Sequence, residues 1–295
     1  MATKVWIGGG NNSASDPHDW LPNGEPQSGD ILVIDQGTIN ITDNDLQGNP
    51  LTIFGRATVN LSQHADVSLQ QPAPTSVTVN ASGADHLSLV GLGFVTINLA
   101  EHAKLTGSFH LTDAGITPSF IAITGGHSAK YIIDGDDVFA GTRAIINADT
   151  LGRGTFVVQF GGGKASSSSL EFGAFVGPGV TIELTGTKII TPGGPFDAEA
   201  SLKIDHPEDF HGTIDLHNVS LADLVGLAEA DSWSFRNDML SIKNACGTVI
   251  DKLHVVSDAS STNGIHGLSV SMSPAGDVLI RPGADFHGTL ALPNS

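Results

Sequence analysis

The sequence has little cysteine, few basic residues and no long apolar run. Cys246 is alone, so no disulfide can form within the chain, which fits the cytosol and equally fits exported proteins that do without disulfides. Only 13 Lys and Arg residues stand against 31 Asp and Glu residues, for a formal net charge of −18. This charge argues strongly against nucleic acid or an anionic membrane surface as a partner. No run approaches transmembrane length, so we expect no membrane insertion.

The residues that are abundant indicate β-structure. The chain of 295 residues contains 36 glycines and is rich in Thr, Ser, Val and Ile, which is typical of many short strands joined by tight corners. This length allows either one large β domain or two ordinary ones, because single solenoids commonly exceed the usual domain size. The sequence therefore predicts an all-β fold.

One four-residue pattern recurs along the first third of the chain. Its asparagines follow one another at intervals of 20, 20 and 18 residues, in the segments Thr38-Ile39-Asn40-Ile41, Thr58-Val59-Asn60-Leu61, Thr78-Val79-Asn80-Ala81 and Thr96-Ile97-Asn98-Leu99. A repeat of about this length is typical of solenoid proteins, in which each repeat must stack on a neighbour to bury its apolar side.

The alternation within each repeat assigns its two sides. Successive side chains of a strand point to opposite faces, so Ile39 and Ile41 share the face opposite to Asn40. We therefore predict a parallel β-helix whose aliphatic residues fill the interior. Its outward face would carry polar ladders that form the candidate binding surface, made of Thr38, Asn40, Thr58, Asn60, Thr78, Asn80, Thr96 and Asn98.

The N-terminal segment carries a resemblance to a known family. Trp6 is followed by Gly8-Gly9, then by Trp20 near a proline-containing loop, then by Gly29-Asp30 ahead of the first strand. This order resembles the opening of bacterial β-helical passenger and adhesin-like proteins. We expect residues 1–36 to form an N-terminal cap in which the two tryptophans close the end of the solenoid, and residues 37–195 to form its coils.

A second module is expected over residues 196–295. The segment Phe210-His211-Gly212-Thr213-Ile214 is echoed by Phe286-His287-Gly288-Thr289-Leu290, and each copy is predicted to add one more rung. We also expect a helical turn over residues 221–227, capped by Ser220. The module resembles a C-terminal segment of large secreted alphaproteobacterial proteins, although the chain lacks the calcium-binding nonapeptides that often accompany it.

An acidic stretch suggests an enzyme as an alternative. Asp134, Asp136 and Asp137 resemble the paired aspartates of β-helical polysaccharide hydrolases of the polygalacturonase type, in which two carboxyl groups act as acid and base. The N-T-D and R-I-K motifs of that family are missing here. A lyase using Arg143 or Arg153 is a further alternative, but the net negative charge disfavours an acidic polymer as substrate.

Histidines and carboxylates also crowd between His206 and His217. Their spacing is not that of a standard metal site, so we predict neither a metal nor a cofactor.

The main functional hypothesis is a non-catalytic extracellular or cell-surface β-helix that serves adhesion or a biofilm matrix by binding polysaccharide or copies of itself. The first residues contain no apolar signal segment, so export would follow a non-classical route or the chain would be part of a larger secreted protein. Two alternatives stay open: the hydrolase or lyase, and a self-assembling or ice-binding-like solenoid.

Overall fold

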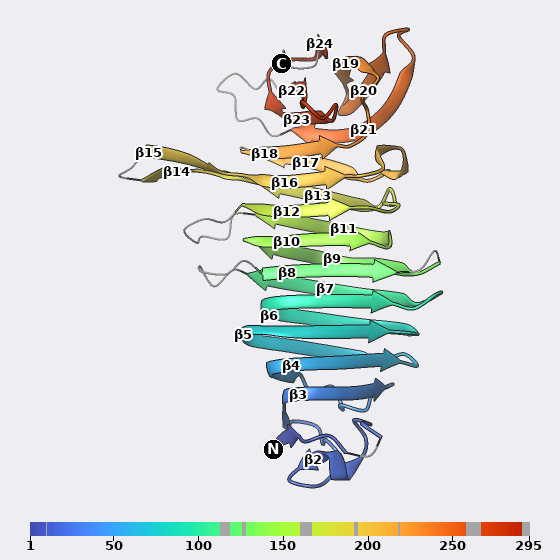
Figure 1. Cartoon of the computed structure of the whole chain (residues 1–295), viewed down its shortest axis with the longest axis vertical. Helices are drawn as coiled ribbons and strands as arrows, with labels where there is room; N and C mark the ends of the chain where they lie inside the picture. Colours follow the sequence, from blue (N-terminus) through green and yellow to red (C-terminus); the bar gives the residue numbers. More distant parts are fainter. Residues whose placement is uncertain are drawn as a thin grey trace.

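A computed structural model describes residues 1–9, 11–112, 119–125, 128–159, 167–191, 194–217, 219–257 and 267–290. Almost all of the described chain is β-structure, with two 3-10 turns (η1, Pro17–Asp19; η2, Pro207–Asp209) and no α-helix. The strands form one long, mostly parallel arrangement that rises from the N-terminal to the C-terminal end of the molecule (Figure 1). The fold is therefore all-β and solenoid-like. In the part of the chain that is described, no helix is long and apolar enough to cross a membrane.

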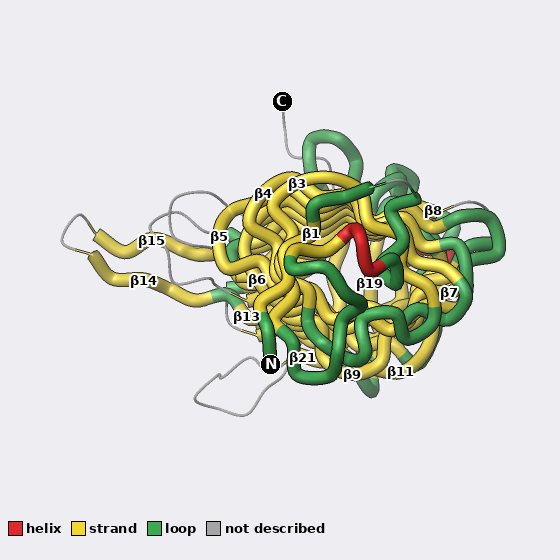
Figure 2. The backbone as a smooth tube through the Cα atoms, turned by 90° about the horizontal axis from the view of Figure 1, so that it is seen from below, coloured by secondary structure: helices red, strands yellow, loops and turns green. Residues whose placement is uncertain are grey.

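Two stacks of parallel strands build this arrangement. Four long strands contribute to both stacks: β3 (Ile31–Thr42), β4 (Leu51–Ser62), β5 (Asp66–Ala81) and β6 (Ala84–Leu99). The first stack continues from the C-terminal halves of these strands through β8 (Ser119–Gly125), β10 (Thr142–Asn147), β12 (Ser168–Phe172), β16 (Ala200–Ile204) and β18 (Ser220–Leu224). The second stack continues from their N-terminal halves through β7 (Lys104–Thr112), β9 (Lys130–Ala140), β11 (Asp149–Gln159), β13 (Val180–Thr185), β17 (Thr213–His217) and β21 (Val249–Ser257). Seen from the N-terminal end, the strands follow an oval outline (Figure 2).

The register of the first stack confirms the predicted vertical file of aliphatic residues. Ile39 pairs with Val59, Val59 with Val79 and Val79 with Ile97. All four side chains are fully buried. The file continues through Ile123, which pairs with Ile97. The 20-residue repeat therefore brings equivalent residues of successive rungs next to one another.

The interior becomes aromatic in the middle of the molecule. Phe109 stacks on Tyr131 with ring centroids 5.6 Å apart, and Tyr131 lies 6.2 Å from Phe156. Phe172 follows at 5.5 Å from Phe156, and Phe210 at 6.4 Å from Phe172. These five rings are buried and come from successive rungs or corners. Aromatic pairs at such separations stabilise the interior beyond the effect of area alone.

The N-terminal segment covers the first rung. Strand β1 (Thr3–Trp6) pairs in parallel with β3 and antiparallel with β2 (Trp20–Leu21). Trp6 and Trp20 are buried and meet edge to face at 5.1 Å, and the Trp20 indole donates to the Ala14 carbonyl at 2.8 Å. Both indoles are packed inside the protein, so neither ring face is presented to a ligand.

The C-terminal part departs from the sequence predictions. Residues 221–227 form no helical turn, because β18 occupies Ser220–Leu224 with alternating burial. The first Phe-His-Gly-Thr copy leads into the parallel rung β17, as predicted. The second copy does not add a rung: β24 (His287–Thr289) pairs antiparallel with β19 (Ala230–Arg236). Antiparallel pairing also joins β20 (Met239–Asn244), β22 (Gly267–Met272) and β23 (Val278–Gly283) to this region.

One antiparallel hairpin leaves the side of the stack. It consists of β14 (Thr187–Thr191) and β15 (Gly194–Ala198), which form a separate two-stranded sheet. Figure 1 shows it extending away from the rungs formed by β13 and β16.

Candidate functional site

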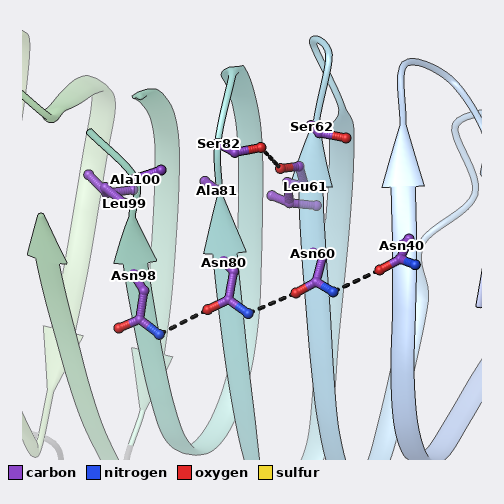
Figure 3. Close-up of a pocket in the computed structure, with 10 residues that line it drawn as sticks. All are labelled: Asn40, Asn60, Leu61, Ser62, Asn80, Ala81, Ser82, Asn98, Leu99 and Ala100. Atoms are coloured by element: carbon purple, nitrogen blue, oxygen red, sulfur yellow. Dashed lines mark hydrogen bonds between the residues drawn. The ribbon is translucent and has the colours of Figure 1, made fainter. Parts of the chain in front are cut away.

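The four predicted asparagines form a continuous hydrogen-bonded ladder. The amide nitrogen of Asn60 donates to the side-chain oxygen of Asn40 at 2.7 Å, Asn80 donates to Asn60 at 2.7 Å, and Asn98 donates to Asn80 at 2.9 Å. Asn40 donates onward to the Asn11 carbonyl at 3.0 Å. The ladder is drawn in Figure 3, with one asparagine on each rung. It arises because the repeat places the asparagines in register on parallel strands.

The ladder lines an open groove of about 500 Å³. Its other lining residues lie at the C-terminal end of each strand or directly after it, namely Leu61, Ser62, Ala81, Ser82, Leu99 and Ala100 (Figure 3). The Ser82 hydroxyl donates to the Leu61 carbonyl at 3.1 Å, which ties neighbouring corners together. The groove therefore has a row of amides along one wall and the small residues Ser62, Ser82 and Ala100 along the other, while the side chains of Leu61, Ala81 and Leu99 are buried.

The predicted threonines lie beside the ladder. Thr38, Thr58, Thr78 and Thr96 occupy one file in register, two residues before each asparagine, and all four are half-buried. They are not among the residues that line the groove. The structure thus brings all eight predicted binding residues onto one face, but only the asparagines reach the groove.

The ladder leaves half of each amide available. An asparagine side chain has two N–H donors and an oxygen with two lone pairs. Within the ladder, Asn60 and Asn80 each use one donor and one lone pair. One donor and one acceptor therefore remain on every inner rung, and they repeat at the strand spacing of about 4.8 Å.

Toward the C-terminal end the same face changes from amides to charges. Thr124 donates to the Asn98 side chain at 3.1 Å, at the end of the ladder. Further along, Lys203 forms ion pairs with Glu171 at 2.9 Å and Asp205 at 2.7 Å. These contacts, with the Asp205 hydrogen bond as the largest effect, raise the pKa of Lys203. The uncharged asparagine ladder and the charged residues therefore occupy different parts of this face.

Asp137 lies inside the solenoid. Its side chain is fully buried, accepts the backbone N–H of Phe109 at 2.7 Å and accepts the hydroxyl of Tyr131. Burial, followed by the charge of Asp137 and this hydrogen bond, raises the pKa of Tyr131 well above its ordinary value. The sequence contained a signal for this placement, because Tyr131, Ile133, Asp137 and Phe139 all lie on the same side of an alternating strand.

The structure does not describe the side chains of the other two candidate catalytic residues. The backbones of Asp134 and Asp136 lie in β9, opposite Arg153 and Thr155 of β11, while their side chains lie outside the described part of the structure. Arg143 lies 3.8 Å from Glu171 on the first stack.

The histidines between residues 206 and 217 make local pairs. His217 lies 3.1 Å from Asp215 and His206 lies 3.7 Å from Glu208. Within the described ranges, no three His, Cys, Asp or Glu side chains gather as a set that could hold a metal ion.

A second hollow, which was not predicted from the sequence, lies at the C-terminal end. It measures about 640 Å³ and is lined by Trp233, Ser234, Phe235, Arg236, Asn237, Lys243, Phe286 and His287. The sequence signal was the concentration of aromatic residues near basic ones in a chain that has only 13 Lys and Arg. It was missed because strands far apart in sequence bring these residues together.

Comparisons of this chain with protein-family models, with curated proteins and with solved structures gave no match.

Proposed function

We propose that this protein is an extracellular, non-catalytic parallel β-helix that binds neutral polysaccharide along the asparagine ladder. The observation that carries the proposal is the groove of about 500 Å³ lined by Asn40, Asn60, Asn80 and Asn98, which are joined by hydrogen bonds of 2.7–2.9 Å. Binding of this kind would serve adhesion or the cohesion of a biofilm matrix.

The chemistry of the groove supports a saccharide ligand. Sugar hydroxyls both donate and accept hydrogen bonds, and each inner amide offers one free donor and one free acceptor. The repeat of these groups at about 4.8 Å suits a polymer of similar units better than a single small molecule. Because the asparagines already bind one another, their side chains are held in place and lose little conformational entropy when a ligand binds.

The charge of the molecule supports a neutral polymer in particular. The ladder is uncharged, and the whole chain has a formal net charge of −18, which would repel an acidic polymer approaching this face. The resemblance of the N-terminal and C-terminal segments to secreted adhesin-like proteins supports an extracellular location.

The placement of Asp137 supports a binding role over the hydrolase alternative. An inverting hydrolase needs two carboxyl groups about 6.5–9.5 Å apart on either side of the substrate. Asp137 instead faces the interior, where it accepts hydrogen bonds from Tyr131 and Phe109. A polysaccharide in the asparagine groove would not reach it.

A glycan panel tests the proposal. The wild type should be retained on at least one neutral polysaccharide column, and the double variant Asn60→Ala, Asn80→Ala should bind it at least about tenfold more weakly, because hydrogen bonds on two rungs are lost. The matched control is Thr58→Ala with Thr78→Ala, which removes polar groups on the same strands but outside the groove.

Three outcomes count against the proposal. If the asparagine and threonine variants bind equally well, the ladder is not the binding surface. Cleavage of a polysaccharide by the wild type that is lost in Asp136→Asn with Asp137→Asn would establish the enzyme instead. A steep rise of light scattering with protein concentration, without binding to any glycan, would favour self-assembly.

A further inference from the structure

The second hollow lies in the antiparallel region, away from the asparagine ladder. Strands β20, β19 and β24 form its sheet, and its volume of about 640 Å³ is within the usual range of ligand sites. A two-residue turn, Asn237-Asp238, joins β19 to β20. Both turn residues have positive φ, at 50° and 60°, as the tight turn of a twisted hairpin requires.

The strand register gathers a histidine and two basic side chains on one face of this sheet. His287 pairs directly with Ser234, and Lys243 pairs with Ser232, so both lie on the serine side of β19. Arg236 follows Ser234 by two residues and therefore points to the same side. The opposite side of β19 carries Trp233 and Phe235, which are 4% and 3% exposed and anchor the sheet to the interior.

The two charged residues of this face lack a direct ion-pair partner within the described part of the chain. Neither Arg236 nor Lys243 makes an ion pair with a described residue, whereas Arg143, Lys203 and Arg281 do. No carboxylate is among the residues that line the hollow. In a protein with 31 acidic and 13 basic residues, this local excess of positive charge is the reverse of the overall balance.

A partly exposed aromatic residue is also among those that line the hollow. Phe286 is 46% exposed and stacks on buried Phe235, with ring centroids 6.4 Å apart and an angle of 15° between the rings. The backbone N–H of Phe235 donates to the Phe286 carbonyl at 2.7 Å, which holds the residue just before β24 in place. Because Phe235 points away from the serine side of β19, the Phe286 ring stacked on it lies on the face opposite to Arg236 and Lys243.

We propose that this hollow binds a carboxylate-bearing saccharide, such as an oligomer of hexuronic acid. The planar guanidinium of Arg236 can form a bidentate pair with a carboxylate, and Lys243 adds a second positive charge. Ser234, which lines the hollow on the same side of β19, would form hydrogen bonds with the sugar hydroxyls. This site differs from the asparagine groove in position and in charge, and the inference does not depend on the function proposed for that groove.

Binding of galacturonate oligomers to the whole chain tests the inference. Titration calorimetry at an ionic strength of about 0.15 M is suitable, because charges farther than about 8 Å away are then largely screened. The wild type should bind the acidic oligomer at least about tenfold more tightly than a carboxyl-reduced oligomer of the same length, since hydrogen bonds between charged partners are the stronger ones. The double variant Arg236→Gln, Lys243→Gln should lose this preference.

Two control variants show whether the preference for the acidic oligomer comes from this hollow. The pair Arg56→Gln and Lys104→Gln removes the same charge at exposed positions far from the hollow and should keep the preference. Asn60→Ala with Asn80→Ala should also keep it. The inference is overturned if the wild type does not bind the acidic oligomer, if it binds both oligomers equally, if the Arg236 and Lys243 variant binds like the wild type, or if the asparagine variant alone loses binding.

Discussion

The asparagine ladder should contribute measurably to stability, and Asn60→Ala tests this. The substitution removes two hydrogen bonds of 2.7 Å, one to Asn40 and one from Asn80. Each such bond contributes about 0.5–1.5 kcal/mol, and water replaces part of it because the amides are half-buried. We expect the free energy of unfolding to fall by about 1–2 kcal/mol, which lowers Tm by about 2–3 °C in a protein of this size.

Chemical denaturation followed by circular dichroism measures this loss. Thr58→Ala is the matched control, because Thr58 lies on the same strand and face and makes no side-chain hydrogen bond with a described residue; its effect should stay within about 0.5 kcal/mol. The double variant Asn60→Ala, Asn80→Ala should be less destabilised than the sum of the single variants, because the two residues share one hydrogen bond. Equal effects of Asn60→Ala and Thr58→Ala, or strict additivity, would refute the reasoning.

Three further predictions concern the interior and the backbone. Tyr131→Phe removes a donor to buried Asp137 and should cost about 1–3 kcal/mol in the free energy of unfolding; an unchanged denaturation midpoint would contradict this. Burial, the largest effect, raises the pKa of Asp251 above its ordinary value of 3.8, so its ionisation opposes folding at neutral pH. Asp251→Asn should therefore raise Tm at pH 7, and the gain should disappear below about pH 3.8, where the carboxyl group is protonated in both states; a gain that does not vary with pH would exclude this cause. Gly152→Ala should destabilise more than Gly226→Ala in thermal unfolding, because both glycines have positive φ (94° and 82°) but only at Gly152 does a new Cβ meet a neighbouring carbonyl, at 2.5 Å; equal losses would show that backbone strain alone decides.

The repeating part of the fold could be predicted because its information is local. Within each Thr-x-Asn segment, the alternation of polar and apolar residues indicates which side chains face the interior. The interval of 20 residues from Asn40 to Asn60 indicates how the segments stack. The register follows, because a slip by one residue would turn Ile39 and Ile41 toward solvent. The hydrogen bonds of the ladder are a direct consequence of that register.

The C-terminal region could not be predicted in the same way. The two Phe-His-Gly-Thr copies are nearly identical in sequence, yet Thr213 begins a parallel strand and His287 begins an antiparallel one. Alternation of apolar and polar residues is the same in both kinds of strand, so it does not distinguish them. The pairing is decided by partners far along the chain. The same is true of the hollow that Arg236, Lys243 and Phe286 line.

The placement of Asp137 shows a different difficulty. A pair of adjacent aspartates suggests an acidic surface or an active site, because buried carboxylates are uncommon. The alternation in β9 nevertheless directs Asp137 inward, where Tyr131 and a backbone N–H meet it. In this strand the alternation of inward and outward side chains predicts the burial of Asp137 better than the charge of its side chain does.

The β14–β15 hairpin shows where the length of this chain can change without disturbing the stacked strands. The rungs before and after it stay in register, since Phe172 pairs with Ile204 and Thr185 with His217 across the excursion. The stack therefore imposes no fixed number of residues on this corner. A foreign peptide inserted into the hairpin would therefore be displayed at the side of the molecule, while the rungs kept their spacing. Insertions during evolution should be tolerated at this corner for the same reason.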